Sequence, residues 1–139
     1  MKTLTLAVLL QVGSALACDG LVVEQGWIRP PMPGMGMTAG YARLSNHGRR
    51  PLAVEEVSSP DFVGTELHRT LVENGVSRMR PGLPLPLAPG AVQTLEPGEY
   101  HLMLFEPKRP LKVGDSVLVE FRCGTQSMQA PFTLRLEIP

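Results

Sequence analysis

Two histidines and two methionines recur at a spacing that could hold a soft metal ion. They are His68, Met79, His101 and Met103, separated by ten, twenty-one and one intervening residues. Imidazole nitrogen and thioether sulfur suit copper, and thioethers favour the reduced ion, Cu(I). Calcium and magnesium require oxygen ligands, and zinc sites use cysteine, histidine and carboxylate. The four residues therefore predict a Cu(I) site.

The segments around these residues read as β-strands, and turn chemistry indicates how they meet. A β-hairpin is predicted at Asn74-Gly75, because this dipeptide supplies the two positive-φ residues of a type I′ turn. Counting outward from a two-residue loop places His68 and Met79 on one face, as diagonal cross-strand neighbours. A slip of one residue would move Met79 to the opposite face. His101 and Met103 share a face by the same alternation.

Each candidate ligand also has a plainer interpretation. A methionine that faces inward on a strand is usually part of the core, and a lone histidine is usually a satisfied polar residue. The metal site is favoured because all four residues occupy compatible faces. His47 lies in a turn and is expected to be solvated. Met32, Met35 and Met37, in a Pro/Gly loop, could make a secondary copper contact or pack on the end of the fold, and the sequence leaves both open.

The same spacing also resembles that of a known family. The pattern His-X10-Met-X21-His-X-Met is similar to that of the periplasmic Cu(I) chaperones called PCu(A)C. Further matching segments are Trp27-Ile28-Arg29, Thr38-Ala39-Gly40-Tyr41, Leu44-Ser45-Asn46, Glu66-Leu67-His68, Met79-Arg80-Pro81 and residues 97–104. One position departs from the family, because the residue after the first histidine, often methionine there, is Arg69.

The resemblance implies a fold, a metal and a partner. The fold would be a cupredoxin-like Greek-key β-sandwich, and the metal Cu(I), bound by His68, Met79, His101 and Met103. The partner would be a copper-acceptor protein, either a cytochrome c oxidase subunit at its CuA centre or an assembly factor of that oxidase.

Composition and periodicity independently favour an all-β sandwich in one domain. Glycine and proline number fourteen each, and no convincing amphipathic helix is present. About nine short strands are predicted, at residues 21–29, 38–46, 51–58, 62–71, 76–80, 91–95, 100–105, 116–122 and 128–138. Residues 81–90 contain four prolines and cannot form a central strand.

The first 17 residues are typical of a signal peptide. Lys2 precedes a mostly apolar run over residues 4–12, and Ala15-Leu16-Ala17 resembles a cleavage site. The run is too short to span a bilayer, which takes about 20 residues. We therefore expect a domain at residues 18–139, located in the periplasm without a membrane span. A lipid anchor on Cys18 is the weaker alternative, because Ala15 stands where a lipoprotein signal normally has leucine.

Cys18 and Cys123 are the two cysteines of the chain. In an oxidising compartment such a pair in a small domain is expected to form a disulfide. A role as metal ligand or redox group is the weaker alternative, because no C-x-x-C motif is present. The formal net charge of zero gives no electrostatic case for binding nucleic acid.

Several enzyme classes lack their required residues. No nucleophile-elbow motif occurs, and a blue-copper centre needs a cysteine with two histidines, whereas Cys123 has no histidine nearby. A non-enzymatic Cu(I) carrier is predicted, whose neutral ligands would yield copper to a thiolate-bearing acceptor and whose imidazoles would lose it to protons in acid. The alternatives are copper storage or detoxification, a structural or adhesive β-sandwich without metal, and a thiol reductase.

Overall fold

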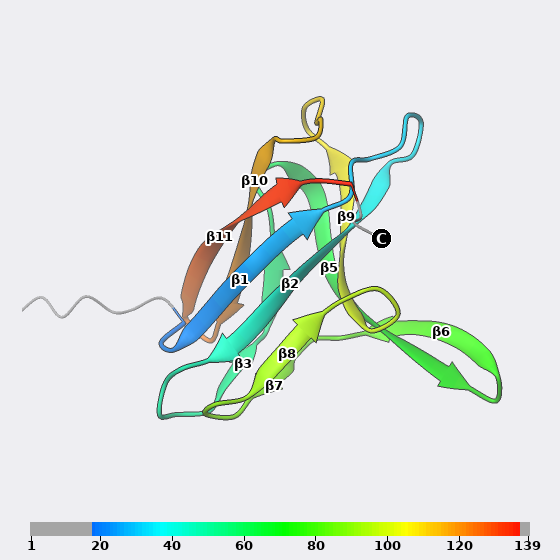
Figure 1. The fold of residues 1–139 in the computed structure, drawn as a ribbon. Coiled ribbons are helices and arrows are strands. Elements are labelled where there is room, and N and C mark those ends of the chain that lie inside the picture. Colours follow the sequence, from blue (N-terminus) through cyan, green and yellow to red (C-terminus); the bar gives the residue numbers. More distant parts are fainter. Residues whose placement is uncertain (1–17, 137–139) are drawn as a thin grey trace, which may run out of the picture.

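Every regular element in residues 18–136, the part of the chain that the computed structural model describes, is a β-strand (Figure 1). The strands are β1 (Leu21–Ile28), β2 (Met37–Asn46), β3 (Leu52–Val54), β4 (Glu56–Ser58), β5 (Phe62–Glu73), β6 (Val76–Pro81), β7 (Leu85–Leu87), β8 (Val92–Leu95), β9 (Tyr100–Pro107), β10 (Ser116–Cys123) and β11 (Gln126–Leu134). The signal peptide predicted at residues 1–17 lies outside the described residues.

Nine of these strands form one sheet that curls around a hydrophobic core. Their order is β4-β10-β11-β1-β2-β8-β9-β5-β6, and β3 pairs separately with β7. Although they stand far apart in this order, β4 and β5 pack against each other, so the sheet closes on itself as a sandwich (Figure 1). The largest fully buried side chains between the layers are Phe62, Phe121, Phe132, Ile28, Leu44, Leu95, Leu102, Leu104, Leu134, Val54, Val117 and Val119. The all-β sandwich predicted from the sequence is confirmed.

Two of the predicted strands differ most from the observed ones. The single strand expected at residues 51–58 is divided at Glu55, whose backbone N–H donates to the carbonyl oxygen of Arg122, and its halves pair with different partners. The last strand ends at Leu134, because its partner β10 begins at Ser116, opposite Thr133. The hydrophobic alternation continues to Leu136, but that side chain is exposed.

A β-bulge in β1 reverses the facing of its residues. The register with β2 shifts by one residue between Glu24 and Trp27, and Gln25 within the bulge has a φ of 55°. Without this extra residue Trp27 would point into the core. With it, Ile28 is buried in the core and Trp27 faces outward, where its ring lies 4.8 Å from that of Tyr41 on β2.

Strand β5 has two different partners along its length. Its first part pairs with β9, and its last part pairs with β6 to form a hairpin arm, residues 68–81, that extends away from the sandwich (Figure 1). The turn residues Asn74 and Gly75 have φ values of 51° and 76°, so the predicted two-residue turn is present. At the base of the arm, the Gly82 N–H donates to the carbonyl oxygen of Leu67 at 2.8 Å.

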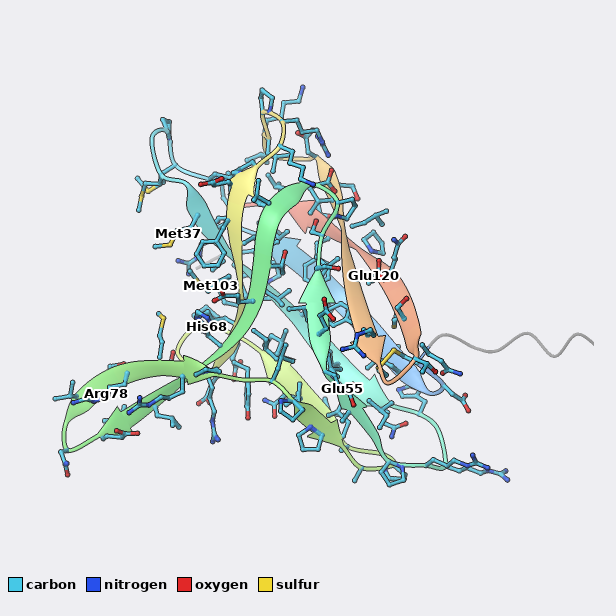
Figure 2. The ribbon with its side chains drawn as sticks, turned by 180° about the vertical axis from the view of Figure 1, so that it is seen from behind. Met37, Glu55, His68, Arg78, Met103 and Glu120 are labelled. Atoms are coloured by element: carbon cyan, nitrogen blue, oxygen red, sulfur yellow. A yellow bond between two sulfur atoms is a disulfide. The ribbon has the colours of Figure 1, made fainter. Side chains whose placement is uncertain are left out.

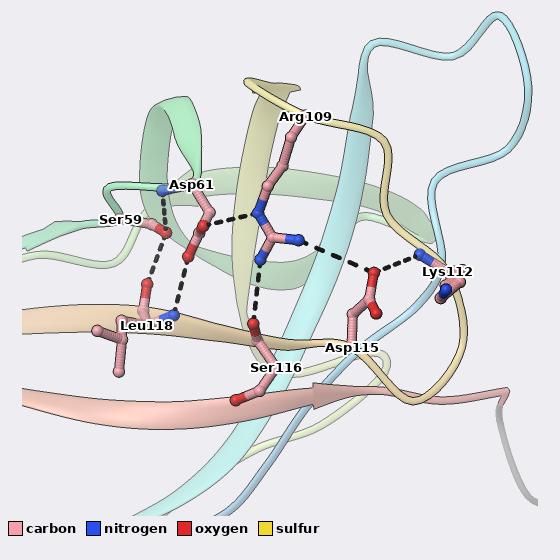
Figure 3. A network of polar contacts seen from close by, with 7 residues as sticks. All are labelled: Ser59, Asp61, Arg109, Lys112, Asp115, Ser116 and Leu118. Atoms are coloured by element: carbon pink, nitrogen blue, oxygen red, sulfur yellow. Dashed lines mark hydrogen bonds and ion pairs between the residues drawn. The ribbon is translucent and has the colours of Figure 1, made fainter.

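The two ends of β10 are fastened differently. At one end, Cys123 forms a disulfide with Cys18, the pairing expected from the sequence. At the other end, the Asp61 carboxylate accepts hydrogen bonds from the Leu118 N–H and from Arg109, which also donates to the carbonyl oxygen of Ser116 (Figure 3). The β4–β5 and β9–β10 connections are thereby joined to β10.

Candidate metal centre

The four predicted ligands lie on β5, β6 and β9, and strand register places them on one face. Thr70 pairs with Met79 across the hairpin, which is the predicted register. On the other side of β5, His68 pairs directly with His101. Met103 follows two residues later on β9. Since side chains alternate along each strand, all four ligands face the same way.

This face is the outer side of the sheet, away from the hydrophobic core. Leu102 and Leu104 point into the core, so His101 and Met103 between and beside them point out of it. They are nevertheless buried, with exposed fractions of 5% and 9%. Figure 2 shows Met103 and His68 close together where the hairpin arm leaves the body. A second, small buried region therefore lies on the outside of the sheet.

The two imidazole rings are neighbours with defined hydrogen bonds. Their centroids are 5.9 Å apart, with the ring planes at 81°. The Nδ1 atom of His101 lies 3.0 Å from the carbonyl oxygen of Glu99, and Nε2 of His68 lies 2.6 Å from the Glu66 carboxylate. Each partner is an acceptor, so these nitrogens carry the protons and donate. The partners thus assign a tautomer to each ring.

The other nitrogen of each ring is buried and has no hydrogen-bond partner among the described residues. These atoms are Nδ1 of His68 and Nε2 of His101. In a neutral imidazole such a nitrogen presents a lone pair, and leaving it buried without a partner is unfavourable. Metal-ligating histidines characteristically donate their second N–H to a carboxylate or a backbone carbonyl. Both rings show that arrangement, so the donor set fits a soft metal ion.

The thioethers differ in exposure. Met103 is buried and lies opposite Glu66, beside His68. Met79 stands on the hairpin arm and is 61% exposed. The structure thus brings His68, His101 and Met103 together on the body of the protein. It places Met79 on the same face but on a projecting element.

No group of three or more His, Cys, Asp or Glu side chains within residues 18–136 is arranged to hold a metal ion. A metal at this face would therefore draw on thioether sulfur as well as imidazole nitrogen. The same stretch of the chain has no helix with the length and apolar character that crossing a membrane requires.

One residue near the site, Glu66, was not predicted from the sequence. Glu66, which hydrogen-bonds His68, could have been noticed from its position two residues earlier on the same strand face. Met37 begins β2, where Ala39 pairs with Met103, so Met37 shares the face of the site. The sequence names Met37 as a possible secondary copper contact, and its position relative to the site follows from the β2–β9 pairing, which no local pattern reveals. His47 is exposed in the β2–β3 turn, as expected.

Sequence comparison relates the chain to a family of putative lipoproteins. A model of the family described as "Putative lipoprotein LpqE-like" matches residues 21–132. A putative lipoprotein of Leifsonia xyli subsp. xyli, Lxx21020, is 32% identical over 107 residues, covering 75% of this chain and 62% of that protein. The uncharacterized protein RP573 of Rickettsia prowazekii is 30% identical over 101 residues, covering 70% of this chain and 56% of that protein. The chain spans less than two thirds of the length of these curated relatives.

Structural comparison relates the fold to PCuAC domains. The copper-bound PCuAC domain from PmoF2 superimposes with a TM-score of 0.70 at 20% identity, covering 88% of this chain and 97% of that one. The apo PCuAC domain from PmoF1 superimposes with a TM-score of 0.70 at 21% identity, covering 88% of this chain and 98% of that one. The solution structure of CuI-DR1885 from Deinococcus radiodurans superimposes with a TM-score of 0.68 at 25% identity, covering 93% of this chain and 87% of that one. The chain therefore has the cupredoxin-like fold of these domains.

Proposed function

The chain belongs to the LpqE-like family, and from this membership and the geometry of its histidine–methionine face we propose that it is a copper chaperone. The observation that carries the proposal is the pair of buried, unpartnered imidazole nitrogens on His68 and His101, beside the buried thioether of Met103. Two of the structurally similar proteins contain copper, namely the copper-bound PCuAC domain from PmoF2 and CuI-DR1885, and the second holds it as Cu(I). These likenesses support copper as the cargo.

We assign His68, Met79, His101 and Met103 as the Cu(I) ligands. Two neutral imidazoles and two thioethers add no negative charge, and such soft ligands favour Cu(I) over harder ions. A negative charge is supplied indirectly by the Glu66 carboxylate, which hydrogen-bonds to His68 and not to the metal. This donor set would bind copper firmly without a thiolate.

The exposure of Met79 indicates where exchange would begin. Three ligands lie on the body of the protein, whereas Met79 is presented to solvent on the arm. An acceptor thiolate could displace this thioether first, and Cu(I) would pass over by ligand exchange without a change of oxidation state. The proposed acceptor is a thiolate-bearing protein, a cytochrome c oxidase subunit at its CuA centre or an assembly factor. The proposed location is the periplasm.

A structural or adhesive β-sandwich is the main alternative. Such a protein would have no reason to hold two imidazole nitrogens buried and unpaired, since each costs the desolvation of a polar atom. Copper storage is a second alternative. It is disfavoured by an exposed ligand on a projecting arm, which suits release.

Titration of residues 18–139 with Cu(I) against a colorimetric chelator tests the proposal. We expect one tightly bound equivalent, and an affinity lower by at least about tenfold in Met103→Leu and in His68→Ala. Met128→Leu on β11 is the matched control, because it removes a thioether that packs against the core elsewhere. Wild-type affinity in both site variants would remove these residues from the site, and no uptake by the wild type would refute the copper function.

A further inference from the structure

The loop between β1 and β2 presents two methionines at the ends of a tight turn. The Met35 N–H donates to the carbonyl oxygen of Met32 at 2.9 Å, and Gly34 between them has a φ of 77°. Proline followed by a positive-φ glycine is typical of a type II turn. The Cα atoms of Met32 and Met35 therefore lie within about 7 Å of each other, a separation that two thioether side chains can bridge.

A third methionine continues from this turn toward the proposed copper site. Met37 pairs with Phe105, and Ala39 pairs with Met103. Met37 and Met103 are therefore diagonal neighbours on one face, roughly 7–8 Å apart at Cα. Figure 2 shows Met37, Met103 and His68 along the same side of the molecule.

These three methionines are unusually exposed for large apolar side chains. Their exposed fractions are 66% for Met32, 50% for Met35 and 46% for Met37, against 9% for Met103. In these positions they gain little from hydrophobic burial. The backbone beneath them is nevertheless fixed, because the Glu106 N–H donates to the carbonyl oxygen of Gly36 at 2.6 Å. The loop thus holds three exposed thioethers in place, and Met37 carries them onto the strand face that Met103 shares.

We propose that Met32, Met35 and Met37 form a second Cu(I) site, made of thioethers alone, from which copper reaches Met103 and the histidines. The inference rests on the proposed function for the destination of the copper. Three neutral sulfurs without imidazole would bind Cu(I) more weakly than the mixed site, as a point of exchange requires. The ion stays Cu(I) throughout, and each new bond to a sulfur or nitrogen forms as a bond to a thioether breaks.

Cu(I) titration of four proteins tests this second site: wild type, Met32→Leu/Met35→Leu/Met37→Leu, His68→Ala/His101→Ala, and the control Met128→Leu. We expect the wild type and the control to bind a tight and a weaker equivalent. The triple variant should lose the weaker one and keep the affinity of the tight one within about threefold. The double histidine variant should keep the weaker equivalent with only sulfur ligands in X-ray absorption.

The outcomes separate the two proposals. If the triple variant retains two equivalents, or the wild type binds a single equivalent that has nitrogen ligands, the loop site is wrong while the copper chaperone stands. If the wild type and the histidine variant show the same single, sulfur-only equivalent, the proposed chaperone site is wrong while the loop site stands. Nitrogen ligands in the double histidine variant would also overturn the loop site.

Discussion

Glu66 holds the His68 ring in the orientation that a metal would need. Its carboxylate lies 2.6 Å from Nε2, which therefore carries the proton, and Nδ1 is left buried with its lone pair available. A carboxylate in this position also raises the basicity of the ring as a ligand. In the proposed site Glu66 would act on copper through His68, as a positioning residue.

Replacement of Glu66 by alanine should weaken Cu(I) binding by about tenfold, since second-layer partners of ligating histidines typically contribute 10–100-fold to metal affinity. Glu66→Gln should give an intermediate affinity, because an amide oxygen can still accept from Nε2. Chelator competition measures both. The control is Glu120→Gln on β10, a half-buried carboxylate on the other side of the body (Figure 2). Equal affinities for Glu66→Ala and the control would contradict the positioning role.

For single residues, the sequence predicts which side chains share a face better than it predicts their hydrogen-bond partners and burial. The spacing of His68, Met79, His101 and Met103, with the Asn74-Gly75 turn, predicts the shared face that the register shows. The partner of His101 is a backbone carbonyl, which no side-chain pattern reveals. The burial of His101 and Met103 on an outer face was also unforeseen, because alternation gives the direction of a side chain and not what covers it.

Among the strands, β1 depends on a glycine. A Cβ atom at Gly26 would lie 2.7 Å from the ring of Phe132, which is fully buried. Only a glycine lets the bulged backbone approach this ring so closely. The bulge in turn directs Trp27 outward toward Tyr41, next to the face that carries the site.

Gly26→Ala should lower the free energy of unfolding by roughly 1–3 kcal/mol, the usual cost of overpacking a dense core. Gly36→Ala is the matched control, because a Cβ there would meet only Glu106 Cγ, at 3.9 Å. Urea denaturation followed by tryptophan fluorescence compares the two, since Trp27 is the one tryptophan of the chain. A control that loses as much stability as Gly26→Ala would rule out the clash as the cause.

Strands are predictable from sequence where local chemistry decides them. The arm follows from its turn residues. The lack of a central strand in residues 81–90 follows from their prolines: Pro81 ends β6, at the edge of the large sheet, and among the described strands β7 pairs only with β3. The division at Glu55 and the end of β11 at Leu134 depend on which strands lie alongside. Such pairings between distant segments leave no periodic mark in the sequence.

For the molecule as a whole, the Cys18–Cys123 disulfide joins positions 105 residues apart in sequence. It ties the first described residue to the end of β10, far from the histidine–methionine face (Figure 2). The disulfide also occupies the sulfur of Cys18, so the same atom cannot carry a lipid. The lipid anchor suggested by the family description and the disulfide thus exclude each other at this residue.

The double variant Cys18→Ser/Cys123→Ser should have a lower free energy of unfolding. The chain-entropy account predicts a loss of roughly 4–5 kcal/mol for a loop this long. Its affinity for Cu(I) should match that of the wild type, because both cysteines are remote from the ligands. Thermal denaturation and chelator titration measure the two effects. A large loss of copper affinity in a variant that remains folded would mean that the disulfide supports the site directly.

The disulfide also bears on the order in which the chain is oxidised and binds metal. Until the bond closes, the new chain carries two thiols, and thiolates bind Cu(I) more strongly than thioethers do. Cu(I) that reached the chain before then would bind the thiolates of Cys18 and Cys123 and would prevent the disulfide from forming. Under the proposed function, the disulfide would therefore form before copper binds, and the chain would acquire Cu(I) in an oxidising environment.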